Sequence, residues 1–491
     1  MLKKILAGSV ALSCLCCLFA CGHADRYDYE AIRERRGEPG VEFRREKAVP
    51  ESLAELPEEP LTLSRAVAMS LANNPGVDLA VARILQAEAA VARARAAFFP
   101  RVGVWSGLSH GDAPSGYLFK KIDQRDLPRM VNFNDPGWFQ NFEVGAKLQL
   151  NVFNGFQDTL QRRMALTGTE VARWGRAEVE NALASGVIEA YYNTLAAEEF
   201  AVIARESVSM VERQLDIMQV RYEHGGALKS DILSLKVRLA QSQEQLVQAR
   251  NSHSLAMAAL ANLLGLPPDT PVPLKGEDDM DLHLPPDYAS GVDLALSMRP
   301  ELQVARQRVR MAAMGVDKAR GGYLPRVDLE AKYWMADDNL GLDIEDDNYT
   351  GGIMLNWDLF AGGARYAAVD KAEAGLEEML AADRKSTQGV LLDLRSAYLT
   401  LEEARARVEV TEASVVQAAE SLRLVKQEYE GGSATITRYL DAELAYNRAR
   451  TAVATARYDR EKARAAVGRA LGYCGRCGRE SMREYERKQE R

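Results

Sequence analysis

Residues 142–152 read FEVGAKLQLNV, in which apolar residues at even positions alternate with polar or small residues at odd positions. A period of two places each set on one face of an extended strand. The same alternation occurs in residues 327–333 and 353–359, and in a weaker form from Arg101 to Ser109. Strands of about 9–11 residues with one apolar and one polar face are typical of a membrane barrel with a wet interior. The alternative is a soluble antiparallel sheet on a core, but no other segment offers a surface for the sheet to cover.

The segments that follow these strands are free of proline over long distances. Residues 157–223 and 364–430 contain none, and each is predicted to form a helix of about 67 residues, roughly 100 Å long. In the second segment, apolar residues recur every seven positions, at Leu394, Leu401, Val408, Val415, Leu422 and Tyr429. Such spacing predicts a coiled-coil seam. Long helices of this kind could form a helical barrel beside the strands, or an ordinary long coiled coil.

The sequence contains one internal repeat. Asn74-Pro75 returns as Arg299-Pro300, and Phe153-Asn154-Gly155 returns as Phe360-Ala361-Gly362. The first copy carries an insertion ahead of Phe153 that the second copy lacks. We expect the copies to span residues 61–266 and 289–473, joined by a linker over residues 267–288. Each copy is predicted to contain a helix, a β-hairpin (101–153 and 326–360), a long helix (157–223 and 364–430) and a last helix (228–264 and 435–471).

The first sixty residues are predicted to be a targeting segment and a tether. Lys3 and Lys4 precede an apolar run, so residues 1–20 are interpreted as a signal peptide. Leu18-Phe19-Ala20-Cys21 resembles the bacterial lipobox, and we expect lipidation of Cys21; plain signal-peptide cleavage nearby is the alternative. Residues 21–60 are charged and contain several prolines, which predicts a lipidated N-terminal tether without a core.

Few cysteines would remain in the mature chain. Three of the six cysteines lie within the signal peptide. Cys474 and Cys477 form a lone CxxC motif in a polar C-terminal tail, residues 474–491. A zinc site needs about four ligands, and the sequence offers no second pair. We therefore expect a local disulfide or a passive tail, and no metal.

Composition and charge exclude several classes of function. The formal net charge is −8, without a basic stripe, so we expect no nucleic-acid partner. Beyond residue 20, no window is apolar enough for a membrane-spanning helix. The five histidines are scattered, and no nucleophile, base or cofactor motif occurs, so we expect no enzyme and no cofactor. Asp337-Asp338 and Asp346-Asp347 are interpreted as a solvated loop face, with a cation site as the alternative.

The motifs, taken in order and twice over, resemble those of the TolC-like outer-membrane efflux proteins across nearly all of residues 61–473. The motifs are Leu61-Thr62-Leu63, Asn74-Pro75, Phe99-Pro100-Arg101, Val152-Phe153-Asn154-Gly155, Leu359-Phe360-Ala361-Gly362-Gly363, Arg221-Tyr222-Glu223-His224-Gly225 and Tyr429-Glu430-Gly431-Gly432. The lipobox is similar to that of the lipoprotein branch of the family.

The resemblance implies a mainly α-helical protein with membrane β-strands. Three copies would form a homotrimer with a 12-stranded β-barrel in the outer-membrane lipid, continued by a periplasmic α-helical barrel. Such a protein is a passive conduit in the outer membrane of a Gram-negative bacterium, lipid-anchored, serving a tripartite efflux or type I secretion system. Its partners are a periplasmic adaptor (membrane fusion protein) and an inner-membrane transporter. From strand number alone, four strands cannot close a barrel, and two or three copies would both suffice.

Glycine pairs interrupt the helical pattern at matching places, at Gly225-Gly226 and Gly431-Gly432. Glycine there favours a turn between two helices. The resemblance places these turns at the periplasmic tip, where an adaptor docks and the duct closes.

The family often has acidic residues six and nine positions after the turn glycine of the second copy, which is Gly432 in this sequence. Here those positions hold Arg438 and Asp441, and Asp231 lies six residues after Gly225. The resemblance makes Asp441 and Asp231 candidates for a periplasmic gate, in which carboxylates would attract cations. Arg438 departs from the pattern and is expected to pair with Asp441 or Asp231. The alternative for each residue is a solvated charge on a helix surface.

The predicted function is therefore an outer-membrane channel subunit. A non-conducting coiled-coil tether or scaffold between envelope layers is the alternative, since long helices alone suit both. An enzyme is disfavoured by the absence of reactive groups at suitable spacing.

Overall fold

The computed structural model describes residues 59–276, 284–339 and 347–472. These residues divide into a sheet unit, within residues 90–164 and 314–372, and a helical unit that comprises the rest. Both units contain segments from both copies of the repeat. The signal peptide, Cys21, the tether up to residue 58, Asp346, Cys474 and Cys477 lie outside the described residues.

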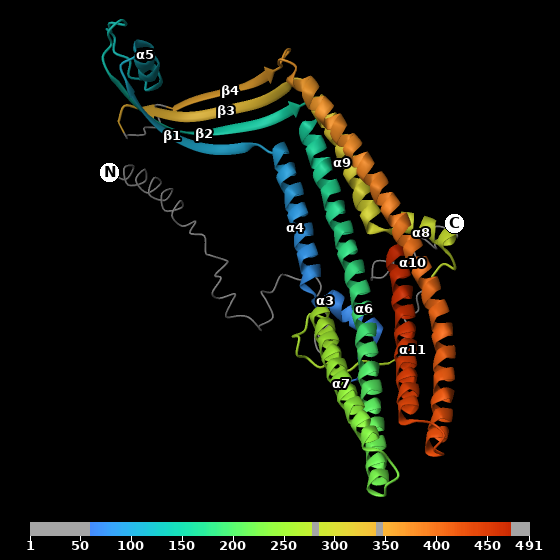
Figure 1. Cartoon of the computed structure of the whole chain (residues 1–491). Coiled ribbons are helices and arrows are strands. Elements are labelled where there is room, and N and C mark those ends of the chain that lie inside the picture. Colours follow the sequence, from blue (N-terminus) through green and yellow to red (C-terminus); the bar gives the residue numbers. More distant parts are fainter. Residues whose placement is uncertain (1–58, 277–283, 340–346, 473–491) are drawn as a thin grey trace. The chain divides into compact units, whose positions relative to one another are not determined.

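The sheet unit contains four antiparallel strands in the order β1-β2-β3-β4 (Figure 1). The strands are β1 (Arg101–Gly111), β2 (Phe139–Asn154), β3 (Arg326–Asp337) and β4 (Asp347–Asn356). Each copy of the repeat supplies one hairpin, and β2 pairs with β3 to join the two hairpins. Strands β1 and β4 are the sheet edges, and each pairs with one neighbour within the described chain.

The register separates the sheet into an apolar face and a polar face. Val104 lies opposite Ala146, and Leu329 opposite Ile353, on the apolar face. The side chains of this face are open to solvent in a single chain, with Val104 79% and Ile353 74% exposed. The opposite face carries Glu143, Lys147, Gln149, Glu330 and Lys332, among others. Large apolar side chains on an uncovered face indicate a surface that meets something other than water.

Strand β4 is shorter than its sequence pattern predicts. The alternation extends to residue 359, but β4 ends at Asn356. Asn356 lies opposite Arg326, the first residue of β3, and Pro325 precedes that residue without an N–H to donate. Beyond this point β4 has no partner strand. Trp357 instead donates from Nε1 to the carbonyl oxygen of Tyr323, at 3.0 Å.

The insertion in the first hairpin contains a helix that the sequence analysis does not predict. This helix, α5 (Pro114–Asp123), lies close to the hairpin loops (Figure 1). It begins with proline at its first position, where the missing N–H has no intrahelical role. The other helices are α3 (Leu63–Asn73), α4 (Pro75–Arg95), α6 (Gln157–Glu223), α7 (Lys229–Leu263), α8 (Tyr288–Met298), α9 (Pro300–Gly321), α10 (Ala364–Glu430) and α11 (Ile436–Leu471), with a short 3₁₀ turn at Ala96–Phe98.

Helices α6 and α10 have 67 residues each, so the described chain is mostly helical. Within the described ranges, no helix combines the length and apolarity needed to cross a membrane.

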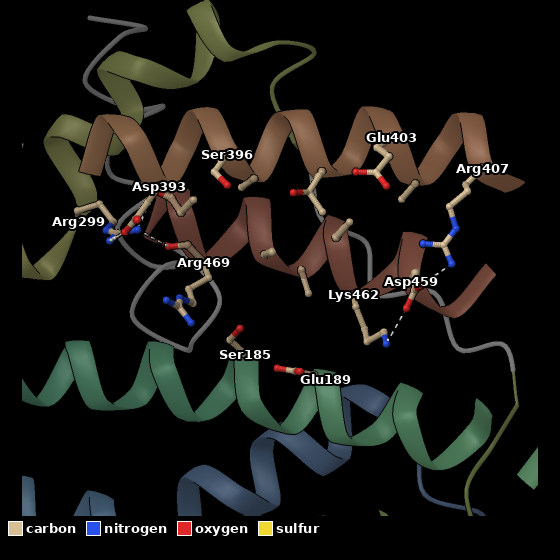
Figure 2. A pocket seen from close by; sticks show the side chains of 17 residues that line it. Ser185, Glu189, Arg299, Asp393, Ser396, Glu403, Arg407, Asp459, Lys462 and Arg469 are labelled. Atoms are coloured by element: carbon tan, nitrogen blue, oxygen red, sulfur yellow. Dashed lines mark hydrogen bonds and ion pairs between the residues drawn. The ribbon is translucent and has the colours of Figure 1, made fainter. Parts of the chain in front are cut away.

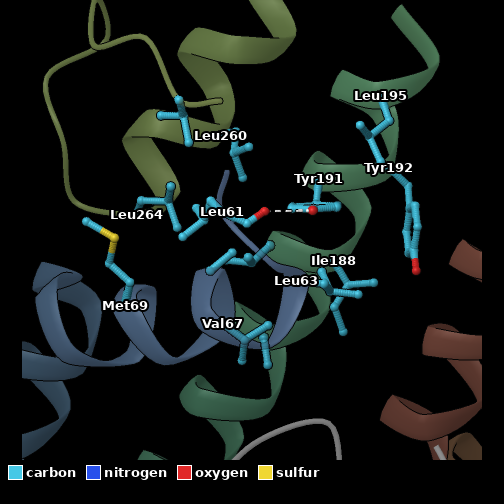
Figure 3. Close-up of a cluster of buried hydrophobic side chains, with 14 of the residues drawn as sticks. Leu61, Leu63, Val67, Met69, Ile188, Tyr191, Tyr192, Leu195, Leu260 and Leu264 are labelled. Carbon is cyan, nitrogen blue, oxygen red and sulfur yellow. Dashed lines mark hydrogen bonds between the residues drawn. The ribbon is translucent and has the colours of Figure 1, made fainter. Parts of the chain in front are cut away.

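The core of the helical unit consists of separate clusters rather than one centre. Around α3 and α6, the fully buried Leu61, Leu63, Tyr191 and Leu260 pack together (Figure 3). The Tyr191 hydroxyl lies 2.8 Å from the carbonyl oxygen of Leu61 and 2.7 Å from that of Lys275. A buried phenol needs such partners, because an unpaired polar group away from water is costly.

The residue before each repeated proline fastens one helix to the end of another. Asn74 donates from Nδ2 to the carbonyl oxygen of Leu263, at 3.0 Å, where α7 ends. Arg299 donates from Nη1 to the carbonyl oxygen of Ala470, at 3.3 Å, near the end of α11. The last carbonyls of a helix have no intrahelical partner, so these side chains satisfy them. This contact gives the Asn-Pro and Arg-Pro motifs a structural role in both copies.

Candidate functional site

The two helix turns of the helical unit have the same backbone design. Gly225 follows the end of α6 with φ +74°, and Gly432 follows the end of α10 with φ +80°. The next amide in each turn donates back into the helix. Gly226 N donates to Arg221 O at 2.7 Å, and Ser433 N donates to Glu428 O at 2.8 Å. These bonds define a Schellman motif, which favours glycine at its left-handed position.

Only one glycine of each predicted pair therefore has a conformational reason to be glycine. Gly225 and Gly432 adopt the left-handed conformation, whereas Gly226 and Gly431 do not. The four glycines look alike in the sequence, because the sequence pattern does not assign φ to adjacent glycines.

The helices that follow the turns position the predicted gate residues. Asp231 lies in the first turn of α7 and is partly buried. A carboxylate there interacts favourably with the helix dipole. The side chain of Thr435 caps α11 by accepting from Arg438 N at 3.3 Å. Asp441 follows on α11 as an exposed residue.

Arg438 forms an ion pair with Glu428 rather than with Asp441 or Asp231. Its Nη1 lies 3.2 Å from Glu428 Oε2, so the pair links α10 and α11 across their turn. The expected pairing with an aspartate is therefore wrong. Glu428 lies in the last turn of α10, and the pairing of α10 with α11 brings it close to Arg438. Among the residues that the structure describes, none forms an ion pair with Asp441.

Near the turns, a cluster of apolar side chains joins the helix pair α6–α7 to the helix pair α10–α11. This tip cluster includes Val211 and Met218 on α6, Leu235 on α7, Tyr429 on α10 and Tyr439 on α11. The rings of Tyr429 and Tyr439 stack with centroids 5.5 Å apart. The Tyr429 hydroxyl lies 3.6 Å from the sulfur of Met218. The tip cluster holds the first copy against the second at the end where the turns lie.

Arg221 adds a charged contact to the tip cluster that the sequence analysis misses. Its guanidinium carbon lies 5.8 Å from the centroid of the Tyr429 ring, which is within the range of a cation–π interaction. Burial raises the pKa of the Tyr429 hydroxyl. The sequence contains both residues in matching repeat motifs, but only the fold shows that they meet.

A buried carboxylate lies near the tip cluster. Glu443 on α11 is 0% exposed, and its Oε1 accepts from Ser207 Oγ at 3.3 Å. Its Oε2 and the nearby Arg238 Nε are buried without hydrogen-bond partners. Burial raises the pKa of Glu443, and the Arg238 charge opposes that rise. A sequence signal for this burial exists: Glu443 lies seven residues after Ile436, so a heptad repeat places it on the same side of α11 as that buried residue.

A groove of about 480 Å³ lies between α6, α10 and α11 (Figure 2). Its wall contains several alanines, and five of its charged side chains pair with one another. Asp393 accepts from Arg299 at 3.2 Å, and Asp459 lies 3.2 Å from Arg407 and 2.8 Å from Lys462. Both aspartates of the groove are thus paired with cationic side chains.

Metal binding finds no support in the described ranges. Among residues 59–276, 284–339 and 347–472, no group of three His, Cys, Asp or Glu side chains could hold an ion. Asp338, one of the acids considered for a cation site, instead accepts from Lys121 at 3.1 Å.

Comparison with known proteins points to one family. Residues 66–266 and 291–473 match the family model described as outer membrane efflux protein. The chain is 25% identical over 407 residues to the pyoverdine export outer membrane protein OpmQ of Pseudomonas putida, which covers 82% of this chain and 84% of that protein. It is 27% identical over 279 residues to the alkaline protease secretion protein AprF of Pseudomonas aeruginosa, covering 56% of this chain and 58% of that protein.

Solved structures show the same fold. The outer membrane protein VceC of Vibrio cholerae superposes with a TM-score of 0.69 at 20% identity, covering 84% of this chain and 96% of VceC.

Proposed function

The chain belongs to the outer membrane efflux protein family and is an outer-membrane channel of an efflux or type I secretion system, and we propose that three copies assemble to form it. In this proposal the sheet unit contributes four strands to a closed barrel of twelve. The helical unit continues the conduit through the periplasm. The family assignment supports a conducting role and gives no support to the scaffold alternative.

The observation that carries the proposal is the sheet with one apolar and one polar face. Backbone groups at a free sheet edge cannot remain unpaired in lipid, so membrane sheets close into barrels. Strands β1 and β4 are edges in a single chain and run antiparallel to each other. Strand β4 of one copy can therefore pair with β1 of the next and keep the alternation around the barrel. The apolar face would meet lipid and the polar face would line the water path.

The long helices set the reach of the conduit. A helix of 67 residues is roughly 100 Å long, which far exceeds the thickness of a bilayer. We propose that α6, α7, α10 and α11 form one copy's part of a periplasmic α-helical barrel. Two tandem repeats, 61–266 and 289–473, would then each supply one hairpin and one helical pair.

The turns are the proposed periplasmic tip. Gly225, Gly226, Gly431 and Gly432 would form the surface at which a periplasmic adaptor docks, with an inner-membrane transporter completing the assembly. Asp231 and Asp441 would form the gate. Since Arg438 is engaged by Glu428, the three Asp441 carboxylates of a trimer are free to act as a ring that attracts cations.

The N-terminus completes the proposal. Residues 1–20 would be removed as a signal peptide, and a lipid on Cys21 would anchor the tether to the outer membrane. A mature chain that starts at a residue other than Cys21, or carries no lipid by mass spectrometry, would contradict this part.

The function is tested by inserting the purified full-length chain into planar lipid bilayers. We expect discrete current steps, and we expect Asp441→Asn to reduce the preference for cations over anions. Ser230→Asn, an exposed polar substitution near the first turn, is the control. An inserted protein that gives no current steps, both as wild type and as Asp441→Ala, would refute the channel.

A further inference from the structure

Helix α5 lies on the polar face of the sheet. Lys120 forms an ion pair with Glu143 on β2. Gln124 donates from Nε2 to Asn141 Oδ1 at 2.8 Å, and Asn141 in turn donates to Glu143 Oε1 at 2.6 Å. Asn141 and Glu143 occupy odd positions of β2, which are the positions of the polar face. The side chains that hold α5 therefore place it on this face, at the end of the sheet where β1 ends and β2 begins (Figure 1).

The packing of α5 against the sheet leads to the same placement. A Cβ on Gly116 would lie 2.9 Å from Phe139 Cε1, so the helix backbone rests directly on this ring. Phe139 also occupies an odd position of β2. Ala336, which lies opposite Glu143 on β3, is completely buried. The end of the polar face nearest the hairpin loops is thus covered.

The C-terminal end of α5 is fastened to the second hairpin. Lys121 Nζ lies 3.1 Å from Asp338 Oδ2, just beyond β3. Asn348 on β4 donates from Nδ2 to the carbonyl oxygen of Asp123 at 3.1 Å. Arg125 donates from Nη2 to the carbonyl oxygen of Asp347 at 3.0 Å. The contacts reach β2 and the second hairpin, so α5 bridges the two copies of the repeat.

The ion pairs of Lys121 with Asp126 and Asp338 help to fix α5 on the sheet. Burial lowers the pKa of Lys121, but hydrogen bonds to Asp126 and Asp338 outweigh this effect and raise it overall. The ammonium therefore stays charged throughout the physiological range and keeps both contacts.

We propose that α5 projects into the lumen of the assembled barrel and forms a constriction at the end remote from the long helices. This inference rests on the proposed function, because it requires a closed barrel with its apolar face outward. In such a barrel the polar face encloses the water path, and α5 lies on that face. Strand β2 leads into α6 at one end, whereas α5 covers the other, so the constriction belongs to the outer mouth.

The size of α5 is sufficient to narrow a twelve-stranded barrel. A helix with its side chains is about 10–12 Å across. A barrel of 8 strands is filled by side chains, whereas 16–18 strands leave an aqueous channel of their own. Twelve strands lie between these limits, and three copies of α5 would share the lumen.

The free side of α5 is suited to contact with its counterparts in the other two copies. Phe119 is 64% and Ile122 42% exposed, and their spacing of three places both on one side of the helix. That side faces away from Lys120 and Gln124, which hold the sheet. Around a common axis these apolar residues would meet the same residues of the neighbouring copies.

The test compares the conductance of anchor variants of the full-length chain in planar bilayers. Lys120→Ala/Lys121→Ala removes the two lysine anchors, and we expect unit conductance to rise by about twofold or more, because pore diameter limits passage. Phe119→Glu/Ile122→Glu should act in the same direction by repulsion between copies. Lys147→Ala/Lys332→Ala is the matched control, since it also removes two lysine charges from the same face, away from α5. Each variant is also measured with Asp441→Ala, so that a closed helical end does not hide the effect.

Labelling gives a second measurement that does not depend on releasing the helix. A bulky thiol reagent attached to Phe119→Cys should reduce the current, whereas the same label on Ser106→Cys, on the apolar face, should not. Conductance equal to wild type in both Lys120→Ala/Lys121→Ala and Phe119→Glu/Ile122→Glu, together with no effect of the Phe119→Cys label, would overturn the constriction and leave the channel intact. An absence of current in every variant, including wild type, would instead overturn the proposed function.

Discussion

Replacing Gly432 by alanine is expected to loosen the turn between α10 and α11, whereas the same change at Gly431 is not. Gly432 has φ +80°, a left-handed conformation that costs a non-glycine residue about 1–2 kcal/mol. No atom outside the immediate chain neighbours lies within 4 Å of the Cβ that alanine would add, so the cost is backbone strain alone. At Gly431 the added Cβ would lie 3.3 Å from Gln427 O. This tight contact offsets the stabilisation that alanine brings by restricting the unfolded chain, and we expect little net change.

Amide hydrogen exchange of the turn is the appropriate measurement. The amide of Ser433 is protected by its bond to Glu428 O, and that of Gly432 by its bond to Tyr429 O at 3.1 Å. Because the turn opens locally, a loss of 1–2 kcal/mol corresponds to about 5–30-fold faster exchange. Exchange followed by mass spectrometry in peptides over residues 426–436 should show this acceleration in Gly432→Ala and not in Gly431→Ala.

The first copy provides an independent repetition of the experiment. Gly225→Ala should loosen the turn after α6, and Gly226→Ala should leave its exchange unchanged, since only Gly225 is left-handed. Equal exchange in the two members of either pair would show that the left-handed backbone is not the reason for glycine at these turns.

Two further predictions concern buried polar groups of the helical unit. Because burial raises the pKa of Glu443 above 4.5, the folded state keeps the proton to higher pH than the unfolded state, and wild-type stability falls as pH rises between the two values. Glu443→Gln should therefore be more stable than wild type at pH 8, by about 1.4 kcal/mol for each pKa unit by which burial raises the Glu443 pKa. At pH 4 the variant should lose this advantage. A difference in urea unfolding that is the same at both pH values would contradict the prediction. Tyr191→Phe should lower the free energy of unfolding by about 0.5–1.5 kcal/mol, because it removes the hydrogen bond of a buried hydroxyl, while Leu61 O keeps the amide of Lys275 as a donor. Urea unfolding should show no such loss in the exposed control Tyr222→Phe.

The features that could be predicted from the sequence are those with a local signal. Alternation with period two indicates the strands, and the absence of proline over residues 157–223 and 364–430 permits very long helices, because each property depends on neighbours along the chain. The order of short motifs, twice over, indicates the family that the comparisons show. The polar and apolar faces of the sheet follow from the same alternation.

The candidate site was predictable only in part. The glycine pairs mark the turns, but the φ angles that distinguish Gly432 from Gly431 arise from the hydrogen bonds of the finished turn. The predicted partners of Arg438 were wrong, because Glu428 lies on the facing helix and only helix pairing brings it close.

The remaining features depend on residues that are far apart in the chain. Strand β4 ends where β3 offers no further partner, although its own alternation continues. Glu443 is buried by two other helices, and α5 is held by residues of both hairpins. Periodicity along a chain specifies which face of an element is apolar, but not which element will cover that face. Burial, charge pairing and strand length depend on that choice, and the choice is made only when distant segments pack together.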